Sequence, residues 1–173
     1  MTVAAIFVVF PLCLAIAAFS DLFTMTIPNR VSAIVLASFV VVAPLAGLPV
    51  ATIGLHLAAA LLVFSVCFGL FAANVMGGGD AKLLTASSVW FGLNTSLLGF
   101  LGSVALAGGL LTVLVLLLRR KESTILAAGL PVPRLLFTEK KIPYGIAIAA
   151  GGLFAYPSSP LMLKAIALAL HGG

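Results

Sequence analysis

Charged residues are scarce in this chain of 173 residues. They make up 8% of it, against 63% hydrophobic residues, whereas a soluble domain carries about 25% charged residues. So few polar groups cannot cover a water-facing surface, and lipid therefore has to be the solvent. A net charge of +5 would indicate nucleic acid in a soluble protein, but in a membrane protein the placement of the charges matters more. We predict a membrane protein with no nucleic-acid partner.

Cysteine is also rare. The two cysteines, Cys13 and Cys67, each lie inside an apolar run, and the sequence contains no CxxC motif and no Cys/His cluster. This excludes a zinc site and a disulfide framework, and no metal or other cofactor is predicted. The first apolar run has no basic segment before it, so it is predicted to be a first transmembrane helix rather than a cleaved signal.

Six apolar runs, separated by polar or Pro/Gly-rich stretches, account for most of the chain. A helix needs about 20 apolar residues to cross a bilayer, so the chain has room for about six crossings and little else. The sequence predicts an all-α polytopic membrane protein with about six transmembrane helices in a single domain, residues 1–173. The runs are Val3–Leu22, Val31–Leu48, Thr52–Ala73, Ala81–Leu93, Leu97–Leu118 and Ile142–Tyr156, followed by a short tail, Leu161–Leu170.

The basic residues predict the orientation. Arg30 follows the first run, Lys82 follows the third, and six more lie between Arg119 and Lys141, whereas only Lys164 falls on the other side. With six spans, the positive-inside rule puts the first eight in the cytoplasm and both termini outside. The basic segment at about 119–141 is then a cytoplasmic loop, which can hold a short amphipathic piece at the lipid surface. Its two acids, Glu122 and Glu139, are predicted to be solvated surface charges.

The other two acidic residues are the candidate site. Asp21 ends the first run and Asp80 begins the fourth, and the two crossings between them place both at the same side and a similar depth. Acids within membrane spans are costly and usually functional. Two carboxyl groups in one site cannot both ionise easily, so one stays protonated while the other acts as a general base on water.

Other uses of these acids stay open on the residues alone. In one alternative, Asp80 is an ordinary helix N-cap, and Asp21 forms an ion pair with Arg30 or caps the turn that follows the first helix. The pair also suits a relay in a small proton- or ion-coupled transporter. A structural subunit of a secretion apparatus, with no chemistry, is a further alternative.

A run of three glycines precedes Asp80. Gly77, Gly78 and Gly79 have no side chains, so a substrate backbone can approach closely and the chain can bend before the next helix. Asp80 would then lie near a helix N-terminus, where the dipole favours negative charge. Lys82 either stabilises this anion or extends its ammonium to the lipid headgroups.

Three stretches together resemble the signature blocks of type IV prepilin peptidases, which are membrane aspartic proteases of the GxGD class. These stretches are "SDLFTMTIPNRVS" (20–32), "GGGDAKLL" (77–84) and "KIPYGIAIAAGG" (141–152). The resemblance implies that Asp21 and Asp80 are catalytic, with Gly77 and Gly79 in the motif and Gly78 at its variable place. It also implies cleavage of basic leader peptides from single-span prepilins or pseudopilins, at the cytoplasmic face of a bacterial inner membrane.

The chain departs from the long members of this family, which carry an additional N-terminal region with CxxC motifs and methylate the new terminus. It begins directly with the first apolar run, so no methyltransferase activity is expected. The short form resembles the peptidases of Flp-type, tight-adherence pilus systems. Archaeal preflagellin peptidases are also short and are the nearest alternative.

The remaining assignments concern packing. Pro28 and Asn29 are predicted to shape the turn after the first helix. Pro143 and Tyr144 start the last helix, where a site-lining role stays open. His56 is expected to pack inside the bundle, as is the short fourth run with Ser87 and Ser88. Trp90 and Tyr156 are assigned to the outer interfacial belt, and close helix packing is assigned to Gly99, Gly102, Gly108 and Gly109.

Overall fold

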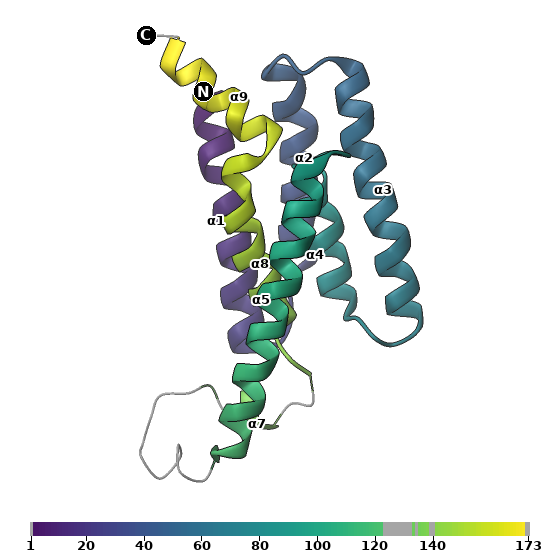
Figure 1. Cartoon of the computed structure of the whole chain (residues 1–173), viewed down its shortest axis with the longest axis vertical. Helices are drawn as coiled ribbons and strands as arrows, with labels where there is room; N and C mark the ends of the chain where they lie inside the picture. Colours follow the sequence, from purple (N-terminus) through teal and green to yellow (C-terminus); the bar gives the residue numbers. More distant parts are fainter. Residues whose placement is uncertain (1, 123–132, 134, 139–140, 172–173) are drawn as a thin grey trace.

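The computed structural model describes residues 2–122, 133, 135–138 and 141–171, and these form helices without any strand. The all-α prediction is confirmed for this part of the chain. The helices are α1 (Thr2–Thr24), α2 (Asn29–Leu45), α3 (Val50–Ala72), α4 (Gly78–Ser88), α5 (Thr95–Arg120), α7 (Leu135–Thr138), α8 (Tyr144–Ala155) and α9 (Pro160–His171), with a 3-10 turn, η1 (Tyr156–Ser158), between the last two (Figure 1).

Three helices are long and apolar enough to cross a membrane, namely α1, α3 and α5. The pair α8 and α9 is a fourth candidate, bent by 47° between Ser158 and Pro160. Helix α2 has 17 residues and α4 only 11, which is about 16 Å of helix against a hydrocarbon core of about 30 Å. Each predicted run is thus helical, and the number of crossings stays a prediction.

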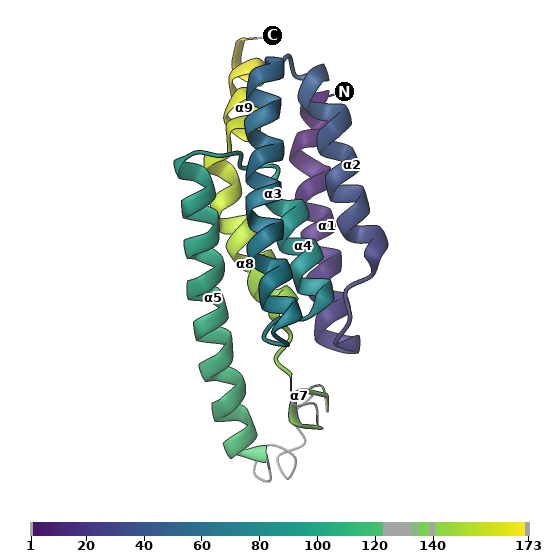
Figure 2. The same ribbon diagram turned by 90° about the vertical axis from the view of Figure 1, so that its right-hand side faces the viewer.

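The helices run up and down beside one another, so that both termini lie at one end of the molecule (Figures 1 and 2). Helix α8 packs between α1 and α5, whereas α4 packs on α2 and α3. Ser87 and Ser88 of α4 are fully buried, which confirms that this short helix belongs to the interior. The end opposite the termini holds the C-terminal end of α5, with Arg119 and Arg120.

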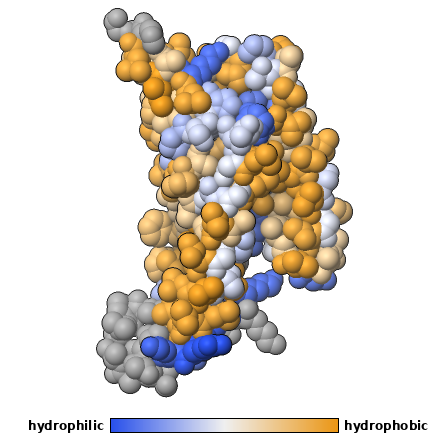
Figure 3. Space-filling view, viewed as in Figure 1, coloured by the Kyte–Doolittle hydropathy of each residue, from blue (hydrophilic) through white to orange (hydrophobic). Residues whose placement is uncertain are grey.

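The surface agrees with a lipid environment. Hydrophobic residues cover most of the face in Figure 3, and strongly hydrophilic residues lie toward its two ends, including the lower end, where α5 ends. Most of the predicted basic loop (residues 123–132, 134 and 139–140) lies outside the described residues, and Glu139 with it. Glu122 is exposed, as predicted for a solvated charge.

An aromatic cluster fills the part of the bundle beyond the end of α4. Trp90 and Tyr156 are at most 3% exposed, so their assignment to an interfacial belt is wrong. The short α4 lets the chain turn inside the bundle, and η1 folds the Tyr156 ring inward. The polar atoms are satisfied there: Trp90 Nε1 donates to Val35 O at 3.0 Å, and Tyr156 Oη donates to Ile6 O at 2.6 Å.

His56 belongs to the same cluster, and the prediction that it packs inside the bundle is confirmed. It is 1% exposed, and its ring stacks on Phe39. Its Nδ1 lies 2.6 Å from Val89 O, which fixes the ring against the turn after α4.

Two glycines of α8 allow this helix to fit between its neighbours. A Cβ atom on Gly151 would lie 2.5 Å from the backbone nitrogen of Val104 in α5. A Cβ on Gly152 would lie 2.7 Å from the Leu14 side chain in α1. The predicted packing role is right for Gly108, which faces the Tyr144 ring. It is wrong for Gly99, Gly102 and Gly109, where no atom of the described residues lies within 4 Å of an added Cβ.

Gly151→Ala should destabilise the folded protein, because its methyl group would meet backbone atoms of α5 that cannot turn aside. Overpacking of this kind costs about 1–3 kcal/mol. Thermal unfolding in detergent should show a midpoint lowered by several degrees. Gly109→Ala is the matched control, since its methyl group would enter open space. Equal midpoints for the two variants would contradict the close α5–α8 contact.

Candidate active site

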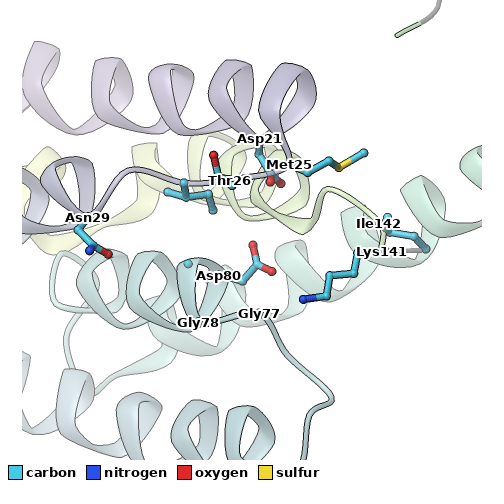
Figure 4. A pocket seen from close by; sticks show the side chains of 11 residues that line it. Asp21, Met25, Thr26, Asn29, Gly77, Gly78, Asp80, Lys141 and Ile142 are labelled. Atoms are coloured by element: carbon cyan, nitrogen blue, oxygen red, sulfur yellow. The ribbon is translucent and has the colours of Figure 1, made fainter. Parts of the chain in front are cut away.

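Both aspartates line one cavity, which lies at the end of the bundle opposite the termini. The cavity has a volume of about 270 Å³ and is formed by the end of α1, the turn into α2, the start of α4 and the segment before α8 (Figure 4). The sequence prediction that the two acids lie at one side and depth is therefore met by this geometry. Its lining residues are Asp21, Met25, Thr26, Ile27, Asn29, Gly77, Gly78, Gly79, Asp80, Lys141 and Ile142.

Asp21 is held from across the bundle. Its side chain lies in the last turns of α1 and is 5% exposed, so its carboxyl group needs a partner inside the protein. The backbone N–H of Gly145, at the start of α8, donates to Asp21 Oδ2 at 2.7 Å. A Cβ on Gly145 would lie 2.8 Å from that same oxygen, so only glycine leaves room for the carboxylate. This contact takes the place of the alternatives in which Asp21 caps a turn or pairs with Arg30.

Asp80 lies in the first turn of α4. The helix begins at Gly78, and its N-cap residue is Gly77, so the alternative that Asp80 is the N-cap is wrong. A Cβ on Gly77 would lie 2.9 Å from Asp80 Oδ2, and one on Gly79 would lie 3.3 Å from Ile27 Cβ. The glycines thus let the carboxyl group turn back over the chain and let α4 approach the turn after α1.

The two carboxyl groups point toward one another across the cavity (Figure 4). Asp21 comes from α1 and Asp80 from α4, and neither helix is the other's neighbour in sequence. The exposed Lys141 side chain also reaches this cavity, from the segment just before α8. The arrangement can bind a polar chain between two acids and activate a water molecule there.

The half-buried Asp80 carboxyl is outside the three long helices, and its pKa is strongly shifted. Burial, together with the negative charge of Asp21, raises the pKa of Asp80 from 3.8 to about 7, although the Lys141 ammonium acts in the opposite direction. Near neutral pH, therefore, Asp80 can hold a proton while facing a second carboxyl group. This is the protonation pattern that paired acid–base catalysis needs.

The other predicted residues divide between lining and support. The three glycines line the cavity, and so does Asn29, for which the sequence predicted only a role in the turn after the first helix. Lys82 does not, because it is exposed and its Nζ donates to Asn29 Oδ1 at 3.0 Å. Pro28 is the exposed residue that precedes α2, and Pro143 is the buried residue that precedes α8. Tyr144 lines a neighbouring groove rather than this cavity.

Sequence reasoning missed three contributors. Gly145 and Lys141 lie in the third signature stretch. The sequence does not indicate that Gly145 would hold Asp21 or that Lys141 would lie near Asp80. Arg119 donates from Nε to Leu136 O at 2.8 Å and from its terminal nitrogen to Lys141 O at 3.0 Å. It thereby fixes the backbone of the segment that carries Lys141.

Within the described residues, no three His, Cys, Asp or Glu side chains lie together as metal ligands would. The expectation of a site without metal or cofactor stays a prediction.

The comparisons with known proteins identify the family of this chain. The type IV leader peptidase family has a sequence model that matches residues 8–113. The chain belongs to the type IV leader peptidase family. As a member of this family it is a membrane-embedded protease. The matched residues include Asp21, the three glycines and Asp80, but end before α8. No curated protein and no solved structure matches the chain significantly.

The raised pKa of Asp80 can be measured directly, because Asp21 and Asp80 are the only aspartates in the chain. In protein labelled with ¹³C at aspartate carboxyl groups, the Asp80 signal should titrate with a midpoint near 7. Asp21→Asn removes a negative charge and should lower this midpoint, whereas Lys141→Gln removes a positive charge and should raise it. Lys82→Gln is the control and should leave it unchanged. A wild-type midpoint near 4 would refute the coupling.

Proposed function

We propose that this leader peptidase family protein is an aspartic endopeptidase that removes basic leader peptides from pilin-like precursors. The observation that carries the proposal is that two carboxyl groups, from helices distant in the chain, face each other in one cavity. The family match supports proteolysis, and the pair of acids supports an aspartic mechanism.

The geometry supports different starting roles for the two acids. Because Asp80 holds the proton of the pair near neutral pH, Asp21 is assigned as the general base that takes a proton from water, and the Gly145 N–H holds its carboxyl group in position. Asp80, protonated near neutral pH, donates to the peptide carbonyl oxygen as water attacks the carbonyl carbon. When the resulting diol collapses, Asp21 gives its proton to the leaving amine, and the diol hydroxyl returns a proton to Asp80. The pair ends as it began.

The basic residues support a cytoplasmic position for the cavity. Arg119, Arg120 and Lys141 lie at the same end of the molecule as the aspartates. By the positive-inside rule, this end faces the cytoplasm of a bacterial inner membrane and both termini lie outside. A single-span prepilin or pseudopilin would present its leader at this face, as in Flp-type pilus systems. A preflagellin is the alternative precursor, and neither requires a cofactor or nucleic acid.

Asp21→Asn and Asp80→Asn should each abolish processing of a co-expressed pilin precursor. Each removes a proton-transfer group, which is worth about 10²–10⁴-fold in rate. A gel of membrane fractions would show the full-length precursor with either variant and the shortened product with the wild type. Glu122→Gln makes the same chemical change at an exposed acid and should leave processing intact. Shortening by either aspartate variant would refute the paired mechanism.

Gly145→Ala should impair processing without removing any ionisable group. The new methyl group would occupy the space of Asp21 Oδ2 and displace the carboxyl group from its hydrogen bond. We expect at least a tenfold lower initial rate of precursor shortening by purified protein. The control is Gly99→Ala, whose methyl group would meet no atom of the described part of the chain within 4 Å. Wild-type activity of Gly145→Ala would contradict the role of this contact.

A further inference from the structure

One end of the aspartate cavity carries an amide side chain that does not cap its own helix. Asn29 and Lys141 both line the cavity, and Figure 4 shows them on opposite sides of Asp80. Asn29 is the first residue of α2, close to the place where asparagine often caps a helix. The N-cap residue is instead Pro28, and no side chain bonds to this helix end. The Asn29 amide is therefore available for other contacts.

Lys82 fixes the orientation of this amide. Its Nζ donates to Asn29 Oδ1 at 3.0 Å. An ammonium group has only donors, so the amide atom that it contacts has to be the oxygen, and the nitrogen Nδ2 then lies on the other side of the amide group. Among the described residues, none accepts a hydrogen bond from Nδ2. Two N–H donors are thus left without a protein partner at the edge of the cavity.

Lys82 is free for this contact because it is turned away from Asp80. Residues two positions apart on a helix point to nearly opposite sides of it. Accordingly, Lys82 does not line the aspartate cavity, although Asp80 does. The Lys82 ammonium joins α4 to the start of α2, and the group that reaches the cavity there is a neutral donor rather than a second cation.

The other groups of the cavity define what this amide can bind. An ionised carboxylate only accepts hydrogen bonds, so the proton on Asp80 is the one donor that the acid pair offers to a peptide carbonyl. An extended peptide presents a carbonyl group at every residue, about 3.3 Å apart. A chain that crosses the two acids toward α2 would bring one of these carbonyl groups to Asn29.

We propose that Asn29 is a substrate-binding residue whose amide N–H groups hold a backbone carbonyl of the extended substrate, and that Lys82 is the positioning residue that keeps the amide in this orientation. This inference rests on the proposed function and adds a binding contact away from the reacting bond. Asn29 contributes to substrate affinity, and Lys82 acts through Asn29.

Asn29→Ala tests the binding role, with purified protein and a pilin-like precursor that the wild type shortens. Loss of a hydrogen bond should raise the KM about threefold to tenfold, with kcat changed by less than about twofold, because Asn29 takes no part in proton transfer. If the Lys82–Asn29 contact only held α2 to α4, its loss would displace Asp80 and lower kcat. A lower kcat with an unchanged KM, or no change in either, would overturn the proposal.

Substitutions of Lys82 test the orientation of the amide. Lys82→Arg keeps a side chain with donors only and should keep the KM within about twofold of the wild type. Lys82→Glu provides only acceptors, which favours the reversed amide with Oδ1 toward the substrate, and should raise the KM at least as much as Asn29→Ala. Arg30→Glu is the control, since it makes the same change of charge at an exposed residue that does not line the cavity.

The double variant decides whether Lys82 acts through Asn29. Lys82→Glu should have no further effect on the KM once Asn29 is alanine. An equal rise of the KM with Arg30→Glu, or a full effect of Lys82→Glu in the Asn29→Ala background, would overturn the proposal. If the wild type shortens no pilin-like precursor, the proposed function fails and this inference fails with it. If it shortens the precursor but the KM values do not follow this order, only this inference fails.

Discussion

The hydrogen bond from Gly145 N–H to Asp21 Oδ2 is the contact on which the site depends. A carboxyl group that is 5% exposed has to be satisfied within the protein, and its partner lies 124 residues further along the chain. The bond ties the end of α1 to the start of α8. Because α8 also carries Gly151 and Gly152, it can pack closely on α5 and α1, which keeps its first residue in place. The close packing of α8 on its neighbours therefore helps to hold the hydrogen bond between Gly145 and Asp21, and this bond in turn fixes the start of α8.

Glycine has a different use in each part of this arrangement. Gly145 leaves room for a carboxylate oxygen, Gly77 lets Asp80 turn back over the chain, and Gly151 lets two backbones touch. In each case a methyl group would fall on an atom that the structure needs. Glycines thus allow helices and carboxyl groups to approach closely. The carboxyl groups of Asp21 and Asp80 occupy space that a methyl group on Gly145 or Gly77 would fill.

The sequence predicted the helices, the placement of both acids at one end, and the glycine turn before Asp80, because these follow from apolar run length and charge order. It did not predict Gly145 or Lys141 as site residues, since their contacts depend on how α8 packs against helices far away in the chain. Trp90 and Tyr156 were misplaced for a similar reason. The polar atom of a Trp or Tyr ring can donate a hydrogen bond to a backbone carbonyl in the interior as well as to a lipid headgroup at the interface. These two rings lie in the interior because α4 is short and leaves space there, which the sequence does not show.

Arg119 shows which helix controls the charge beside Asp80. Its guanidinium holds the carbonyl oxygens of Leu136 and Lys141, so the segment before α8 is fastened to the last turn of α5. The Lys141 ammonium, which acts against the rise in the Asp80 pKa, therefore belongs to a segment that is held by the end of α5. A displacement of the end of α5 would therefore move a positive charge relative to Asp80, although no residue of α5 lines the aspartate cavity.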